Sequence, residues 1–235
     1  MSDTLLDLRE AVCRANLALV EGGLAFGTFG NVSGADQKAG VLVIKPSGVP
    51  YEQLTPARMV AVSLETGAVM GGDLRPSSDT ATHLELYRAF GCGGIAHAHS
   101  EAATALAQAR APLRCLGTTH ADYFRGDVPV TRDLTRQEVE REYERNTGLA
   151  IVQTFRERGL SPSEIPAVLV ASHGPFAWGP DPMTAVEHAK VLEYLARIDR
   201  SSRLVAGGAV AAPAAYLVDK HFFRKHGKGS YYGQR

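Results

Sequence analysis

The sequence predicts an α/β fold on a mixed or mostly antiparallel sheet, and three observations support this prediction. Segments with helical spacing of apolar residues alternate with short strand-like segments along the chain. The first third contains strand-like runs over 41–45 and 59–65 and a glycine-rich turn near residue 71, which indicates hairpins rather than repeated strand–helix–strand units. No internal repeat or long linker divides the chain, so we expect a single domain over residues 1–235.

The elements of the first half follow from local spacing and end signals. Apolar residues at helical spacing predict an opening helix over residues 4–21, which a pair of glycines ends. The two strand-like runs come next. We then expect a helix after Asp79, a strand over 94–98 and another helix from about Ser100.

The second half is expected to contain longer helices. A capping box from Thr135 to Glu138 opens the first of them, because the two side chains can satisfy each other's free backbone N–H groups. The remaining elements are then a strand over 167–172, a helix that begins at Asp181 and Pro182 and runs to about Arg203, and a helix over 213–226.

Composition narrows the class of protein. The 25 basic and 25 acidic side chains balance and form no block of like charge, so we expect no nucleic-acid partner and no membrane partner. No run approaches the roughly 18 apolar residues of a membrane span, and charges interrupt every apolar run near the N-terminus, unlike a secretory signal. The three cysteines are far apart and match neither a disulfide framework nor a metal knuckle. These features predict a cytoplasmic enzyme.

Two histidines near the end of a predicted strand indicate a metal site. His97 and His99 are two residues apart, and alternate side chains of a strand point to the same face. His173, which follows the strand predicted over 167–172 and lies in a predicted turn with the sequence SHGPFAWG, is the best third ligand. Three histidines with an open position are typical of catalytic zinc. The alternative is that His97 and His99 are surface or hydrogen-bonded histidines without a metal.

Three small polar turns form a second group of candidate site residues. They are Gly30–Ser33, Lys45–Gly48 and Pro76–Asp79. Glycine lets backbone N–H groups approach an anion, serine hydroxyls donate hydrogen bonds, and the start of the helix after Asp79 favours negative charge. Together the turns predict a phosphate site, and the alternative is that each is an ordinary turn.

Seven strings identify a resemblance that runs from about residue 4 to 234. The strings are GNVSGAD, VIKPSGV, RPSSDTATH, GGIAHAHS, GTTHADYF, SHGPFAWG and RKHGKGSYYGQ. In this order they resemble the class II aldolase/adducin family, and TTHADYF and YYGQ resemble its epimerase branch. The resemblance implies a three-layer α/β/α sandwich with one zinc ion per subunit. It also implies a homotetramer whose active sites lie between subunits.

The resemblance also implies a role for each site residue. The zinc ligands would be His97, His99, His173 and, as a further ligand, Asp79. The substrate phosphate would be bound by Asn31, Lys45, Ser47, Gly48, Ser77 and Ser78. Proton transfer would fall to Asp122 and Tyr232, on opposite sides of the reacting carbon, and His221 would be a further substrate- or phosphate-binding residue near the same site. We expect Tyr232 to act in a neighbouring subunit, because the tail from Gly227 has few apolar anchors of its own.

The implied substrate is a phosphorylated pentulose. The reaction would interconvert L-ribulose 5-phosphate and D-xylulose 5-phosphate by breaking and remaking the bond between carbons 3 and 4. Two alternatives remain. One is an aldolase that releases its fragments, such as an L-fuculose-1-phosphate aldolase, in which the resemblance leads us to expect Glu where this chain has Asp79. The other is a non-enzymatic assembly module like the adducin head.

Overall fold

Six strands form one sheet in the order β3-β2-β1-β4-β6-β5 in the computed structural model, which describes residues 3–227 and 229–232. The strands are β1 (Asn31–Asp36), β2 (Val41–Ile44), β3 (Val60–Ser63), β4 (Gly94–His97), β5 (Ala167–Leu169) and β6 (Pro175–Gly179). Every neighbouring pair is antiparallel. An isolated parallel bridge joins Val130 to Leu169 of β5. The predicted fold class is therefore confirmed.

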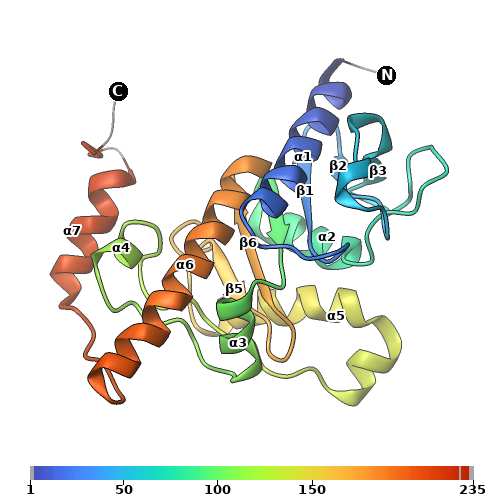
Figure 1. Cartoon of the computed structure of the whole chain (residues 1–235). Coiled ribbons are helices and arrows are strands. Elements are labelled where there is room, and N and C mark those ends of the chain that lie inside the picture. Colours follow the sequence, from blue (N-terminus) through green and yellow to red (C-terminus); the bar gives the residue numbers. More distant parts are fainter. Residues whose placement is uncertain (1–2, 228, 233–235) are drawn as a thin grey trace.

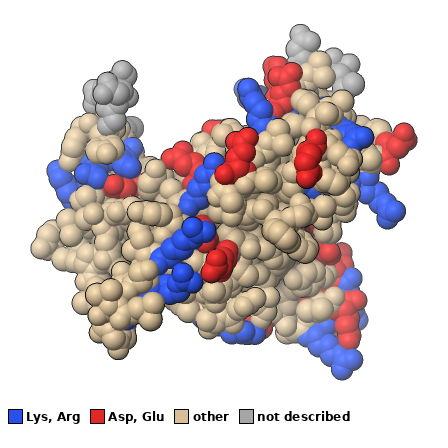
Figure 2. All heavy atoms as spheres, viewed as in Figure 1, with Lys and Arg blue, Asp and Glu red and all other residues tan. Residues whose placement is uncertain are grey.

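Helices cover both faces of this sheet. They are α1 (Asp3–Glu21), α2 (Thr80–Phe90), α3 (Glu101–Gln108), α4 (Thr118–Ala121), α5 (Arg136–Glu157), α6 (Pro182–Ala206) and α7 (Ala215–Lys225), with two 3₁₀ turns, η1 (Tyr51–Gln53) and η2 (Pro56–Arg58). In Figure 1, α1 and α6 run over the strands on one side, while α7 and α4 lie beside each other at one edge of the molecule. Lys and Arg are interspersed with Asp and Glu on the face shown in Figure 2, as the balanced composition predicts.

Side-chain alternation along β1 shows how the layers are divided. Val32 faces α1, where its backbone N–H donates to Asn16 Oδ1 over 2.8 Å. The next residue, Ser33, faces α2, where its hydroxyl lies 2.6 Å from His83 Nδ1 and 2.8 Å from the Tyr87 hydroxyl. The sheet therefore lies between a layer with α1 and α6 and a layer with α2 and α5.

A row of three glycines lets α6 begin directly on the sheet. Gly34, Gly94 and Gly179 are paired side by side across β1, β4 and β6. A Cβ on Gly94 would lie 2.4 Å from backbone atoms of Asp181 and Pro182, where α6 starts. Asp181 caps the helix as predicted, accepting a hydrogen bond from the Thr184 N–H over 2.8 Å. The start of α6 and the start of β4 are thus fixed relative to each other.

Three local predictions were wrong, each for a physical reason. Gly30–Ser33 is not a turn, because Asn31–Ser33 belong to β1, where Asn31 Nδ2 donates to Asp79 and the Ser33 hydroxyl bonds to His83. The strand expected over 167–172 ends at Leu169, because residues 170–173 turn back into β6. The second half of the expected turn SHGPFAWG is β6 itself, and the short helix α4 was not expected.

Among the described residues, no helix combines the length and apolar character needed to cross a membrane.

The glycine row predicts that Gly94→Ala destabilises the fold. The atoms that an added methyl group would meet are backbone atoms of a helix start, which cannot rotate away. We expect a loss of about 1–3 kcal/mol in the free energy of unfolding, the usual size of an overpacking effect, measured by urea denaturation. Gly117→Ala is the matched control, because no atom lies within 4 Å of the position that its Cβ would take and its φ is −171°. Equal stability of the two variants would contradict this account of the packing.

Candidate functional site

The three predicted histidines meet at the end of the central strands. Their ligand nitrogens all lie within 4.8 Å of one another, and His97 Nε2 is 3.1 Å from His99 Nε2. Nitrogens that share a tetrahedral zinc ion at about 2.0–2.1 Å are about 3.3 Å apart. The cluster therefore fits a divalent metal ion, with His97 delivered by β4 and His173 by the turn before β6.

Hydrogen bonds outside the cluster orient two of the imidazoles. His97 Nδ1 lies 2.9 Å from Pro175 O, and because a carbonyl can only accept, Nδ1 carries the proton and Nε2 keeps its lone pair. The His97 ring is 1% exposed and stacks on Phe176 with 4.1 Å between centroids. His173 Nδ1 is 3.2 Å from the Tyr143 hydroxyl, which leaves its Nε2 for the metal. Such partners are usual for metal-binding histidines.

Burial also favours the neutral form of the His173 and His99 imidazoles. Desolvation, followed by the proximity of His97 and His99, lowers the pKa of His173 to about 4. Desolvation likewise lowers the pKa of His99. Because a metal binds the unprotonated ring, no proton has to be displaced from these two rings at neutral pH.

Asp79 lies just outside the histidine group. It occupies the N-cap position of α2 but its side chain makes no capping bond, and it accepts a hydrogen bond from Asn31 Nδ2 over 2.6 Å instead. Its Oδ2 is 4.0 Å from His97 Nε2. Burial raises the pKa of Asp79, but the nearby histidines and Asn31 outweigh it and the net shift is downward. Asp79 is thus a carboxylate at the site, and its direct ligation of the metal stays a prediction.

The phosphate end of the predicted site contains a buried ammonium group. Lys45 is 2% exposed, and its Nζ contacts two carbonyl oxygens, of Thr28 at 3.5 Å and Pro46 at 3.4 Å. No carboxylate within 4.0 Å pairs with it among the described residues, and burial lowers its pKa. A desolvated cation without a counter-charge favours an anionic ligand.

Two loops are joined so that the serines lie next to this ammonium. An antiparallel bridge links Pro46 to Pro76, with Ser47 N donating to Arg75 O and Ser77 N donating to Lys45 O, each over 2.9 Å. Gly48 has a φ of +68°, a left-handed conformation that glycine adopts without strain. The loop that contains Ser47 and Gly48 can therefore turn tightly beside the loop that contains Ser77.

One pocket of about 430 Å³ contains both ends of the site. Every residue predicted to hold the metal or the phosphate lines it, His221 excepted. Four further residues line the pocket that the sequence did not predict there, namely Thr28, Phe29, Tyr143 and Glu144. The last two reach the pocket because α5 is broken at Glu142 (φ −138°, ψ 65°), and no sequence signal marks that kink.

Asp122 and His221 form a separate cluster between α4 and α7. Asp122 accepts two hydrogen bonds from Arg224, at 2.9 and 2.7 Å, and one from His221 Nδ1 at 3.0 Å. Burial raises the pKa of Asp122, but the bonds from Arg224 and His221 and the charge of Lys225 bring it below its usual value. Asp122 is therefore held as a carboxylate among cations.

Tyr232 belongs to the same cluster. Its backbone N–H donates to Arg224 O over 3.0 Å, and the Arg224 guanidinium lies 4.6 Å from its ring centroid. The side chain is 59% exposed. Within the described part of the chain, none of Asp122, His221 and Tyr232 lines the pocket with the histidines. The structure thus divides the predicted site residues into two groups. The residues predicted to bind metal and phosphate share one pocket, and the residues predicted to transfer protons lie in a separate cluster.

Comparisons with known proteins show which family and which structures this chain is similar to. The family model "Class II Aldolase and Adducin N-terminal domain" matches residues 10–199. The structure of an L-fuculose 1-phosphate aldolase is 26% identical, with 95% of this chain and 97% of that chain covered and a TM-score of 0.78. YgbL from Klebsiella pneumoniae, a putative aldolase/epimerase/decarboxylase, is 28% identical, with coverages of 92% and 98% and a TM-score of 0.71. An L-fuculose-1-phosphate aldolase from Thermus thermophilus is 28% identical, with coverages of 87% and 100% and a TM-score of 0.66.

The lowered pKa of His173 predicts a pH-dependent stability of the metal-free chain. An unfolded histidine binds its proton near pH 6.5, whereas folded His173 does so only near pH 4. Between these values the unfolded state binds more protons, so the free energy of unfolding should fall as the pH falls. Urea midpoints measured with a chelator at pH 7.5, 6 and 5 should show this, and the change should be smaller in His173→Gln. Identical pH dependence in both proteins would contradict the assignment.

Proposed function

The chain belongs to the class II aldolase and adducin family, and from this we propose that it is a metal-dependent epimerase interconverting L-ribulose 5-phosphate and D-xylulose 5-phosphate. One observation carries the proposal: a single pocket combines the three-histidine cluster with the buried ammonium of Lys45. Class II aldolases generally use a divalent metal, and the cluster can hold one. A ligand with an anionic end and chelating oxygens fits such a pocket.

His97, His99 and His173 would hold the metal, zinc in our proposal, with Asp79 beside them. When bound, the ion supplies Lewis-acid stabilisation of negative charge that develops on the substrate oxygens. At the other end, Lys45 would give the phosphate a charge-assisted hydrogen bond. The hydroxyls of Ser47, Ser77 and Ser78, the Asn31 side chain and the Gly48 backbone complete the proposed phosphate and substrate contacts.

The chemistry follows from the position of the inverted centre. Carbon 4 of the pentulose bears no acidic hydrogen, so its direct deprotonation is unfavourable. If the bond between carbons 3 and 4 breaks, its electron pair passes into an enediolate over carbons 2 and 3, and the carbon 4 hydroxyl loses its proton to give an aldehyde. The aldehyde turns its other face, the bond forms again, and the oxygen recovers a proton. Asp122 and Tyr232 would remove and return this proton.

We further propose that this proton-transfer cluster serves the pocket of a neighbouring subunit in a homotetramer. Asp122, His221 and Tyr232 gather around α7 and Arg224, apart from the pocket of their own chain. A complete site therefore requires a second copy. The exposure of the Tyr232 side chain is compatible with this role.

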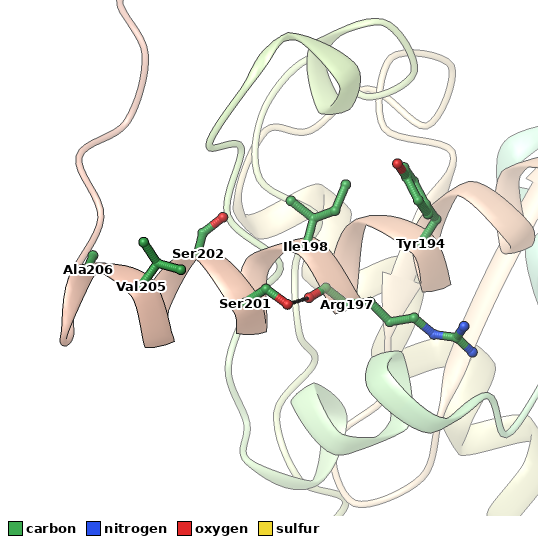
Figure 3. A pocket seen from close by; sticks show the side chains of 7 residues that line it. All are labelled: Tyr194, Arg197, Ile198, Ser201, Ser202, Val205 and Ala206. Carbon is green, nitrogen blue, oxygen red and sulfur yellow. Dashed lines mark hydrogen bonds between the residues drawn. The ribbon is translucent and has the colours of Figure 1, made fainter.

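An apolar face of α6 supports association of copies. Figure 3 shows Tyr194, Ile198 and Ser202 on one side of the helix. These residues are among those of α6 that line a hollow of about 590 Å³. Tyr194 is 58% exposed, and Val205 one turn beyond Ser202 is 91% exposed. Figure 2 shows largely uncharged surface where α6 ends. Exposed apolar side chains gathered on one helix face are typical of an interface.

An aldolase that releases its fragments is the second candidate. The similar structures of L-fuculose 1-phosphate aldolases favour it. The carboxylate at position 79 favours the epimerase, because the resemblance leads us to expect the longer Glu in the aldolase branch and the chain has Asp79. The third alternative, an assembly module without activity, is disfavoured by the complete metal and phosphate pocket.

The first test of the proposal is a direct comparison of substrates. The zinc-loaded protein should convert L-ribulose 5-phosphate to D-xylulose 5-phosphate in a coupled assay and should give little condensation of dihydroxyacetone phosphate with lactaldehyde. His97→Asn should lose bound zinc and nearly all turnover while remaining folded by circular dichroism. Efficient condensation without epimerisation would instead support the aldolase.

The second test concerns the division of the site between subunits. Asp122→Asn should keep its metal and lower the turnover number by about 10²- to 10⁴-fold, the size of a general acid–base contribution. If inactive Asp122→Asn and His97→Asn chains are unfolded, mixed equally and refolded, each site draws its metal pocket and its proton-transfer cluster from different chains. Random assortment should then restore roughly one site in four.

A second mixture provides the control for this experiment. Asp122 and Tyr232 lie in the same cluster of one chain, so Asp122→Asn mixed with Tyr232→Phe should recover no activity beyond the average of the two parents. Absence of recovery in the first mixture as well would show that pocket and cluster act within one subunit or that the cluster takes no part.

A further inference from the structure

Two residues with unusual backbone conformations contact each other beside the histidine cluster. Among the described residues, Ser172 (φ +62°) and Arg110 (φ +53°) are the non-glycine residues in the left-handed region. Arg110 Nη2 donates a hydrogen bond to Ser172 Oγ over 2.6 Å. Glycine is the usual residue where φ is positive, because a Cβ makes that conformation unfavourable. The presence of two larger residues indicates that their side chains have a role.

Asp133 joins the two side chains in a closed triangle. Its Oδ1 accepts from Ser172 Oγ at 3.1 Å and from Arg110 Nη2 at 3.0 Å, and its Oδ2 accepts from Arg110 Nε at 3.1 Å. Arg110 follows α3, Asp133 precedes α5, and Ser172 lies in the turn that joins β5 to β6. The triangle therefore ties together three segments that are far apart in the sequence.

The segment held by the triangle is the turn that carries His173. His173 N donates to Val170 O over 3.0 Å, which makes Ser172 the third residue of a four-residue turn, the position where type II turns require positive φ. Other segments bind the turn as well. Ala171 N donates to Thr131 Oγ1 over 3.0 Å, and Ser172 N donates to Ala107 O over 3.2 Å.

The triangle lies at the surface, which limits what it adds to overall stability. The side chains of Arg110 and Asp133 are 52% and 55% exposed. Exposed ion pairs contribute little to the free energy of unfolding. Ser172 has a strained backbone and lies next to a candidate metal ligand, and the network that holds it adds little stability. A role in placing the neighbouring His173 therefore explains the strain better than a role in overall stability.

We propose that Arg110, Asp133 and Ser172 are positioning residues that fix the His173 imidazole relative to His97 and His99 and thereby set the metal affinity of the cluster. The inference rests on the metal site of the proposed function but not on the identity of the substrate. The triangle acts on the backbone of the turn, while the Tyr143 hydroxyl acts on His173 Nδ1. Together they fix both the position and the rotation of the ring.

The Ser172→Gly variant separates the effect of the triangle on the His173 turn from its effect on the stability of the fold. Glycine adopts the same φ without strain, so the folded state should be as stable as the wild type or more so, but the hydroxyl that joins Arg110 to Asp133 is lost. Ser172→Ala removes the hydroxyl and keeps the strain. Asp133→Asn weakens the triangle at another corner. The matched control is Asp127→Asn, which changes a carboxylate of similar exposure that pairs with Arg114 at 2.8 Å.

The test measures metal affinity, not activity. The full-length metal-free proteins are titrated with Zn²⁺ against a competing chelator, and the absorption spectrum of Co²⁺ is recorded on the same proteins. Ser172→Gly and Asp133→Asn should bind Zn²⁺ about 10- to 100-fold more weakly, the usual effect of removing groups that orient metal ligands. Ser172→Gly should melt at or above the wild-type temperature, and Asp127→Asn should bind as the wild type does.

Two results would overturn the inference, and they are distinguishable. Wild-type affinity in both Ser172→Gly and Asp133→Asn would show that the triangle does not position His173, while leaving the metal site intact. A wild-type chain that bound no Zn²⁺ would remove the metal site of the proposed function and this inference with it.

Discussion

A buried imidazole has to present one nitrogen to the pocket without leaving another polar atom unsatisfied, and the bond from His97 Nδ1 to Pro175 O meets that requirement. It joins β4 to the first residue of β6. Because His97 lies in the central part of the sheet, its position is fixed by the same backbone pairing that forms the core. The glycine row beneath α6 fixes the opposite end of β4. The candidate ligand is therefore placed by the paired backbone at the centre of the sheet.

A ladder of polar side chains extends this constraint to the second layer. Asp79, His83 and Tyr87 are four residues apart on one face of α2, and they meet Asn31 and Ser33, two residues apart on β1. Burial lowers the pKa of His83 to about 3, so it stays neutral. A shift of α2 along β1 would break these three contacts, so they favour the observed register of helix on strand. The Asp79 carboxylate at its end is held where the pocket begins.

Local signals predicted most of the fold and much of the pocket. The helix starts at Thr135 and Asp181 were correct because capping depends on residues a few positions apart. Spacing predicted the meeting of His97 and His99 with His173. β1 was missed because its polar residues are satisfied by partners some 50 residues later, which no local pattern records. Tyr143 was missed for a related reason, since it reaches the pocket through a kink at Glu142 that no glycine or proline marks. The separation of Asp122 and Tyr232 from the pocket is likewise a tertiary property.

That separation has a consequence for the proposed chemistry. The metal pocket is built on paired strands and buried loops, whereas the proton-transfer cluster rests on α7 and on ion pairs between Asp122, Arg224 and Lys225. In its own chain Asp122 is fully engaged with cations, and a carboxylate stabilised in this way is a weaker base. Arg224 and His221 bond to the Asp122 carboxylate in its ionised form, so it would act as a base on a substrate only where these bonds are weakened.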